Sequence, residues 1–188
     1  MTKRITVRSS EMDMATIDAI RQAHGDVNLI IQIAPVEDVT ALTEEDCWAL
    51  IGQLDWAAGG DEEEDEAIVA PLLQSLVDAS ITHIYQFADW LAEQLWKLDT
   101  PAHAQNLIEE DGFLSVDDFL YARCAVVANG AEFFNAVLDN PSLFPTSVTF
   151  SALLYLPHEA FQRKTGQKMA YIPPFDYETY GNKQAWGR

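Results

Sequence analysis

The sequence predicts a mainly α-helical protein: a compact multi-helix domain with a small N-terminal β-α-β element and an extended aromatic C-terminal tail. Apolar side chains recur at helical spacing from residue 43 to residue 166, which predicts the domain. The first 34 residues alternate in character as strand, helix and strand. Residues 167–188 hold five aromatic side chains and two adjacent prolines without either periodicity. We therefore expect these last residues to form an arm laid over the domain.

The N-terminal segment, residues 1–36, is expected to be a separate appendage. Its two predicted strands, 3–9 and 27–34, flank a predicted helix over residues 13–25. Strands joined through a helix normally pair in parallel by a right-handed crossover. A unit of this size has too little core to fold alone, so we expect it to pack on the rest of the chain.

Three side chains at predicted helix starts carry capping signatures. A hydroxyl in front of an apolar run can accept a hydrogen bond from a free backbone N–H of the first turn. Thr43 is followed by Asp46 at the third position, and Ser115 is followed by Asp118 at the same spacing. Ser80 precedes a long apolar stripe. Each of the three is expected to begin a helix of the domain.

Glycine and proline mark the expected helix ends. Pro71 is expected to begin or kink a helix, and Pro157 to break one helix and start another, because proline lacks the backbone N–H that a helix interior needs. The expected ends are Gly59-Gly60, the residue before Pro101, and Gly166.

The stretch SVDDFLYARCAVVANG, residues 115–130, has two interpretations. In the first it is a structural helix: Asp117 and Asp118 lie in its first turn, where the helix dipole favours negative charge. Arg123, in mid-helix, would then pair with a carboxylate from another helix, because a partly buried guanidinium needs a partner. In the second, Arg123 forms a pocket with the two aspartates. We favour the first interpretation.

The charge is unevenly distributed along the chain. There are 30 acidic and 11 basic residues, a net charge of −19, and a pI near 4.2. Residues 22–96 contain 16 acids and no Lys or Arg. Crowded like charges destabilise a compact state unless a cation or a basic partner offsets them. A protein of this net charge repels nucleic acid, which is therefore excluded as a partner. The simplest alternative explanation of the acidic composition is that it keeps the protein soluble.

The sequence offers no pattern typical of a metal site, a cofactor site or a catalytic centre. The four histidines share no metal-ligand spacing, and the acidic run 61–66 lacks the spaced ligands of a calcium loop. Cys47 and Cys124 suit reduced thiols packed in a core. The first residues lack a secretory signal and no apolar run is long enough to span a membrane, so we expect a cytoplasmic protein without cofactor, metal or membrane contact.

A partner-binding surface is predicted in the acidic part of the chain. Aromatic side chains beside carboxylates can anchor a tight interface, and concentrated charge raises the rate of association. Trp48 and Trp90 fall on amphipathic helices and are expected in the core. The residues predicted to bind a partner are Asp55, Trp56, Asp61, Glu62, Glu63, Glu64, Asp65 and Glu66.

Four segments in order resemble the bacterial domain of unknown function DUF4240. They are TEEDCWALI, ITHIYQFADWLAEQLWKLDT, DGFLSVDDFLYARCAVVANGAEFFNAVLDNPSLF and FSALLYLPHEAFQRKTG, and they cover residues 43–166. The most specific part is the spacing of Ser115, Asp117, Asp118, Phe119, Arg123 and Gly130, with Lys164-Thr165-Gly166 at the close. The resemblance implies a compact helical domain and carries no assigned activity.

Two classes of function are left by the sequence. The first, which we favour, is an acidic interaction protein that binds a basic protein, in its most concrete form an immunity protein that neutralises a bacterial toxin. The alternative is an enzyme or small-ligand sensor with an inter-helical pocket around Asp117, Asp118 and Arg123. The absence of catalytic spacing favours a protein that is not an enzyme. The oligomeric state is left open.

Overall fold

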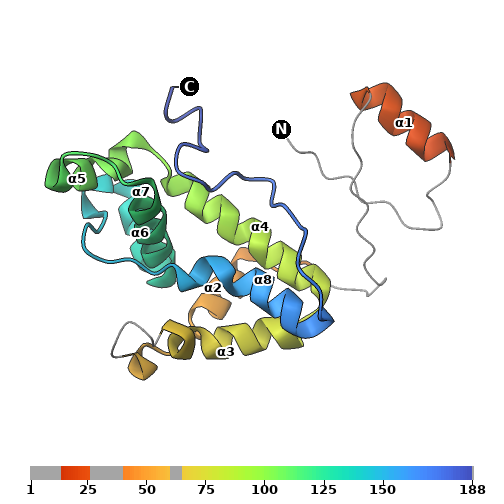
Figure 1. The fold of residues 1–188 in the computed structure, drawn as a ribbon, viewed down its shortest axis with the longest axis horizontal. Helices are drawn as coiled ribbons and strands as arrows, with labels where there is room; N and C mark the ends of the chain where they lie inside the picture. The colour runs from red at the N-terminus through yellow and green to blue at the C-terminus, as the bar shows by residue number, and fades with distance from the viewer. Residues whose placement is uncertain (1–13, 26–39, 60–64, 188) are drawn as a thin grey trace. The chain divides into compact units, whose positions relative to one another are not determined.

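The structure is a computed structural model that describes residues 14–25, 40–59 and 65–187 (Figure 1). The chain divides into two units, Met1–Glu37 and Asp38–Arg188. The elements are α1 (Met14–His24), α2 (Glu44–Ile51), the 3₁₀ turn η2 (Trp56–Ala58), α3 (Asp65–Asp78), α4 (Ile81–Leu98), α5 (Pro101–Asp111), α6 (Val116–Ala128), α7 (Ala131–Asp139), the 3₁₀ turn η3 (Pro141–Leu143) and α8 (Ala152–Thr165).

The predicted fold class needs one correction, at the N-terminus. The described residues contain helices and no strand, so the structure does not show the β-α-β element expected over residues 1–36. The helix expected between the two strands is present as α1, whereas the expected strands, 3–9 and 27–34, lie outside the described residues. Two parallel strands without further neighbours leave most of their apolar surface exposed to water. Alternation of apolar and polar residues is therefore not enough to predict a stable pair.

The core of the second unit is built around α4 and α6. Both helices are buried over most of their surface, and from Phe119 to Ala128 every side chain of α6 except Tyr121 is buried. A helix that is apolar on all sides must be covered on all sides. α8 packs against α3 and α4 (Figure 1). At the other end of this unit, α5 and α7 both pack against η3, and α7 also packs against α6. No helix within the described residues is both long and apolar enough to cross a membrane.

The three predicted caps are confirmed. Thr43 and Asp46 form a reciprocal capping box at the start of α2, with the Thr43 hydroxyl accepting from the Asp46 N–H at 3.1 Å. Ser80 accepts from the backbone at the start of α4, and Ser115 from the Asp118 N–H at 3.4 Å at the start of α6. Capping chemistry is local, so the sequence alone was sufficient to place these helix starts.

Two helix boundaries differ from the prediction. α2 ends at Ile51, with Gly52 as its cap, rather than at Gly59-Gly60, and the separate turn η2 comes after it. α8 runs without interruption through Pro157, where two helices were expected, and α3 likewise contains Pro71. Pro157 is buried against the core, and tertiary packing of α8 outweighs the cost of the missing hydrogen bond. Gly166 ends α8 with a φ of +71°, as predicted.

Residues 167–187 form no helix or strand and run along α4 in the same direction as that helix (Figure 1). The Tyr171 hydroxyl donates to Asp89 at 2.6 Å, and the rings of Phe175 and Trp96 lie 5.3 Å apart. Later in the chain, the Asn182 side chain donates to the carbonyl of Trp96 at 3.2 Å. We call residues 167–187 the C-terminal segment.

His103 connects α5 to α7 from inside the core. Its Nε2 lies 3.3 Å from the Val137 carbonyl, which can only accept, so Nε2 carries the proton. Its Nδ1 lies 2.8 Å from the Thr100 hydroxyl, which donates to it. Burial lowers the pKa of His103 below its ordinary value of 6.5, and nearby Arg123 acts in the same direction. The folded protein therefore holds a neutral imidazole here.

We expect acidification to weaken the fold through His103. Below pH 6.5 the unfolded chain binds a proton at this histidine while the folded chain does not, so the free energy of unfolding falls as the pH drops. Urea unfolding at pH 7 and pH 5 measures the effect. His103→Gln should reduce the difference between the two pH values, by at most about 1.4 kcal/mol per pH unit. His158→Gln, on the exposed face of α8, is the control. An unchanged pH dependence in His103→Gln would contradict this role.

Candidate functional site

Trp56 is held in place by the loop that joins α2 to α3. The Asp55 carboxylate accepts a hydrogen bond from the Ala57 N–H at 3.2 Å and so caps η2. The Asp55 N–H donates to the carbonyl of Ile68 at 3.0 Å, which fixes the loop to α3. The loop that carries Trp56 is therefore held to α3, and 49% of the Trp56 surface is exposed.

A shallow cavity lies beside Trp56. The centres of the Trp56 ring and the ring of the buried Phe150 lie 5.1 Å apart. The Phe150 N–H donates to the Tyr121 carbonyl at 3.1 Å. Val148, 50% exposed, forms part of the rim. The cavity has a volume of ≈ 280 Å³ and is lined by Trp56, Ala125, Asn129, Val148, Thr149 and Phe150. We call this area the Trp56 surface.

Carboxylates without a cationic partner border this part of the chain. Within the described residues, three ion pairs occur, and they join Arg21 to Asp18, Lys97 to Glu93, and Arg163 to Glu159. None of them involves an acid between residues 40 and 78. Asp55 and Glu66 are exposed and Asp65 is half-buried. The other four predicted partner-binding acids, residues 61–64, lie outside the described residues.

Arg123 lies in the interior and is fully buried. Its Nη1 donates to the carbonyls of Leu95 at 2.9 Å and Tyr177 at 3.0 Å, and its Nη2 donates to the Thr179 hydroxyl at 3.0 Å. Its guanidinium carbon stands 4.7 Å from the centre of the Phe119 ring. Burial lowers the pKa of Arg123 to about 10, so the side chain is charged at neutral pH.

The acceptors of Arg123 differ from those that the sequence predicted. We expected a carboxylate from another helix, whereas among the described residues the guanidinium forms no ion pair and is bound by carbonyl and hydroxyl oxygens. Two of these acceptors belong to the C-terminal segment, 54 and 56 residues away in sequence. That segment has no periodicity, so no sequence pattern indicated the contact.

Asp99 is a second buried charge, and no sequence pattern indicated it. It comes directly after α4, and its side chain is completely covered. Its carboxylate accepts from the N–H groups of Tyr180 at 3.2 Å and Asn182 at 2.8 Å, and from the indole N–H of Trp186 at 2.9 Å. All three donors belong to the C-terminal segment. Asp99 and Arg123 therefore hold the same stretch of chain.

Asp117 and Asp118 lie apart from Arg123 in their exposure to solvent. Both are exposed in the first turn of α6, where the backbone N–H of Asp118 donates to the Ser115 hydroxyl. Arg123 is on the same helix, but buried. The two cavities described in this subsection are lined by other residues, so neither of them includes Asp117, Asp118 or Arg123.

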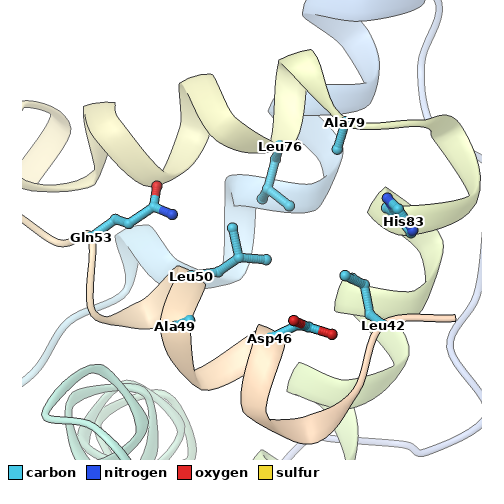
Figure 2. Close-up of a pocket in the computed structure, with 8 residues that line it drawn as sticks. All are labelled: Leu42, Asp46, Ala49, Leu50, Gln53, Leu76, Ala79 and His83. Carbon is cyan, nitrogen blue, oxygen red and sulfur yellow. The ribbon is translucent and has the colours of Figure 1, made fainter. Parts of the chain in front are cut away.

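Another cavity, of ≈ 220 Å³, lies between α2, α3 and the start of α4. Figure 2 shows Leu50 and Leu76 between the helices, with Asp46 beside Leu42. Its polar groups already have partners in the chain. Asp46 accepts from the Thr43 hydroxyl at 2.7 Å, and His83 Nε2 lies 2.9 Å from the Thr40 carbonyl. The lining residues are Leu42, Asp46, Ala49, Leu50, Gln53, Leu76, Ala79 and His83. The arrangement favours apolar contact rather than chemistry.

The two cysteines, Cys47 and Cys124, are buried. Burial raises the pKa of both Cys47 and Cys124 to about 12, so neither thiol is ionised at neutral pH. The Thr100 hydroxyl and His103 Nδ1 have the spacing of a nucleophile and its base, but the hydroxyl caps α5 and the imidazole is bound to a carbonyl inside the core. The described residues contain no group of three or more His, Cys, Asp or Glu residues that could hold a metal ion.

These features define an acidic helical domain with an exposed tryptophan at a shallow apolar cavity. A family model described as "Protein of unknown function (DUF4240)" matches residues 42–163. The chain belongs to this family, which confirms the resemblance found in the sequence. Searches of curated proteins and of solved structures found no match.

Because the Arg123 guanidinium binds several acceptors at once, we expect that lysine in its place destabilises the fold. A lysine ammonium is a single point of charge and cannot reach carbonyls of α4 and the C-terminal segment together with the Thr179 hydroxyl. We expect Arg123→Lys to lower the free energy of unfolding by at least about 2 kcal/mol in urea titration. Arg163→Lys, in an exposed ion pair, should cost less than about 0.5 kcal/mol. Equal costs for the two variants would refute the assignment.

Proposed function

We propose that this chain is a cytosolic interaction protein whose acidic helical domain binds a basic protein through the Trp56 surface and the neighbouring acidic run, residues 61–66. An immunity protein that neutralises a basic toxin is the most concrete form of this proposal. The observation that carries it is that no described acid between residues 40 and 78 is among those that form an ion pair.

The charge of the chain is concentrated in the part that matches the family. Residues 42–163 contain 22 acidic and three basic residues. Of the three, Arg123 is buried, while Lys97 and Arg163 pair with acids of their own helices. Within the described part of residues 42–163, the surface therefore offers no Lys or Arg without a carboxylate partner. The electrostatic field of such an acidic surface attracts a basic protein and raises its association rate.

The Trp56 surface adds a contact that charge alone does not provide. Tryptophan is enriched among the residues that dominate binding energies, above all where the partner excludes water from a pocket. The indole here lies on Phe150 and borders a cavity that also contains Val148. The aliphatic stem of a partner lysine or arginine can lie on such a ring while its charge faces nearby carboxylates.

The alternative function, an enzyme or ligand sensor around Arg123, gains no support from the contacts. An anion at Arg123 would have to displace Tyr177 and Thr179 from the guanidinium. The cytosolic location is proposed from the sequence, with Cys47 and Cys124 as buried, free thiols.

Reversing charges in the acidic run tests the electrostatic part of the proposal. The immobilised chain captures basic proteins from an extract of its source cells at low salt, and the captured protein is purified. Changing Glu62, Glu63, Glu64 and Glu66 to lysine should then slow its association and weaken the dependence of the association rate on salt, measured by surface plasmon resonance. Glu109→Lys with Glu110→Lys on α5 is the control elsewhere on the surface. Equal rates in the two variants would argue against this site.

Truncating the indole tests the apolar part. We expect Trp56→Ala to raise the dissociation rate of the same partner by roughly tenfold or more, with a small effect on association. Tyr155→Ala, which removes another exposed ring from α8, should leave both rates nearly unchanged. If Trp56→Ala binds as the unmodified chain does, the Trp56 surface is not the contact.

A further inference from the structure

The C-terminal segment is bound to the domain as a peptide ligand is bound to its receptor. Its residues form no helix or strand, and polar contacts of Tyr177, Thr179 and Asn182 reach side chains or carbonyls of α4, α6 and Asp99. Anchoring an extended chain through its backbone groups and a few side chains is a common mode of peptide recognition.

The receptor has two fixed, opposite charges. Arg123 accepts nothing and donates to the Tyr177 carbonyl, while Asp99 accepts from the Tyr180 and Asn182 N–H groups. Both side chains belong to the domain and both are fully buried beneath the segment. A cation and an anion at fixed positions favour one direction of a bound backbone. Its carbonyls must face the guanidinium of Arg123, and its N–H groups must face the carboxylate of Asp99.

Aromatic rings surround these two charges. Trp96 contacts Phe175, and Phe119 lies 6.5 Å from the Trp186 ring at an edge-on angle. We call the site formed by Trp96, Asp99, Phe119 and Arg123 the groove. The sequence match to the family ends at residue 163, before the segment begins. In the structure the segment packs on the domain within one compact unit, with Met169 and Tyr171 buried.

The bound segment also has a tightly constrained turn of its own. Tyr180 has a φ of +73°, which side chains of this size rarely adopt. A Cβ added at Gly181 would stand 2.2 Å from the Asp176 carbonyl oxygen and 2.9 Å from that of Glu178. The turn therefore tolerates only glycine at that position.

We propose that the groove is a peptide-binding site and that the C-terminal segment of a second copy of this chain can replace the resident one. The connection to α8 permits this exchange: Gly166 ends the helix, and Gln167 and Lys168 after it are exposed. This inference does not depend on the proposed basic partner.

A nicked full-length chain tests the exchange. A protease site replaces Gln167-Lys168, the protein is purified uncut and then cleaved, and a fluorescent peptide of residues 169–188 is added. Fluorescence anisotropy should show saturable binding to the nicked protein, reversed by unlabelled peptide. The uncut protein should bind far less, because its own segment competes at a high effective concentration. Circular dichroism monitors the helices throughout.

Variant peptides distinguish groove binding from attachment by charge. The peptide with Gly181→Ala should bind roughly tenfold more weakly or worse, whereas Gln184→Ala, exposed in the bound segment, should bind like the unmodified peptide. Equal binding of both variants, or no binding to the nicked protein, overturns the proposal. Loss of the helical signal when the resident peptide leaves also overturns it, because the segment would then be part of the core.

Discussion

The buried guanidinium of Arg123 is the contact on which the arrangement of the second unit depends. It joins α6 to α4 through the Leu95 carbonyl and joins both to the C-terminal segment through Tyr177 and Thr179. A charge taken out of water is tolerated only when its hydrogen-bond donors are satisfied. With Asp99 in the same groove, the protein places two opposite charges under one stretch of chain. The position of that stretch is therefore defined chemically, although it has no regular secondary structure.

The surface obeys a different principle from the core. Inside the second unit, Arg123 and Asp99 are both hydrogen-bonded. On its surface, no described acid between residues 40 and 78 is in the ion pairs that join Arg21, Lys97 and Arg163 to carboxylates. Such a surface destabilises the compact state through self-repulsion. The apolar core around α4 and α6 supplies the stability that allows it. Trp56 is exposed beside Phe150 and directly follows Asp55 in sequence, so an apolar contact surface and a carboxylate occur together there.

The sequence was informative wherever structure depends on neighbouring residues. The caps at Thr43, Ser80 and Ser115 were predictable because a hydroxyl acts within one helical turn of its own position. Pro157 misled the prediction because burial of α8, a property of the whole fold, outweighs the local preference of proline. For the candidate site, Asp55 and Trp56 could be named in advance, but Val148 and Phe150 come from a distant loop without periodicity. The groove was invisible for the same reason: Asp99 and Tyr180 are 81 residues apart.

That separation matters for the order in which the molecule assembles during synthesis. α4 and α6 leave the ribosome before residues 171–187 exist, so the nascent domain passes through a stage in which Arg123 and Asp99 have no segment above them. Contacts that close loops of this length form late, because the entropy of the intervening chain must be lost first. In a crowded cell, neighbouring nascent chains on one messenger would present the same open groove to one another's segments.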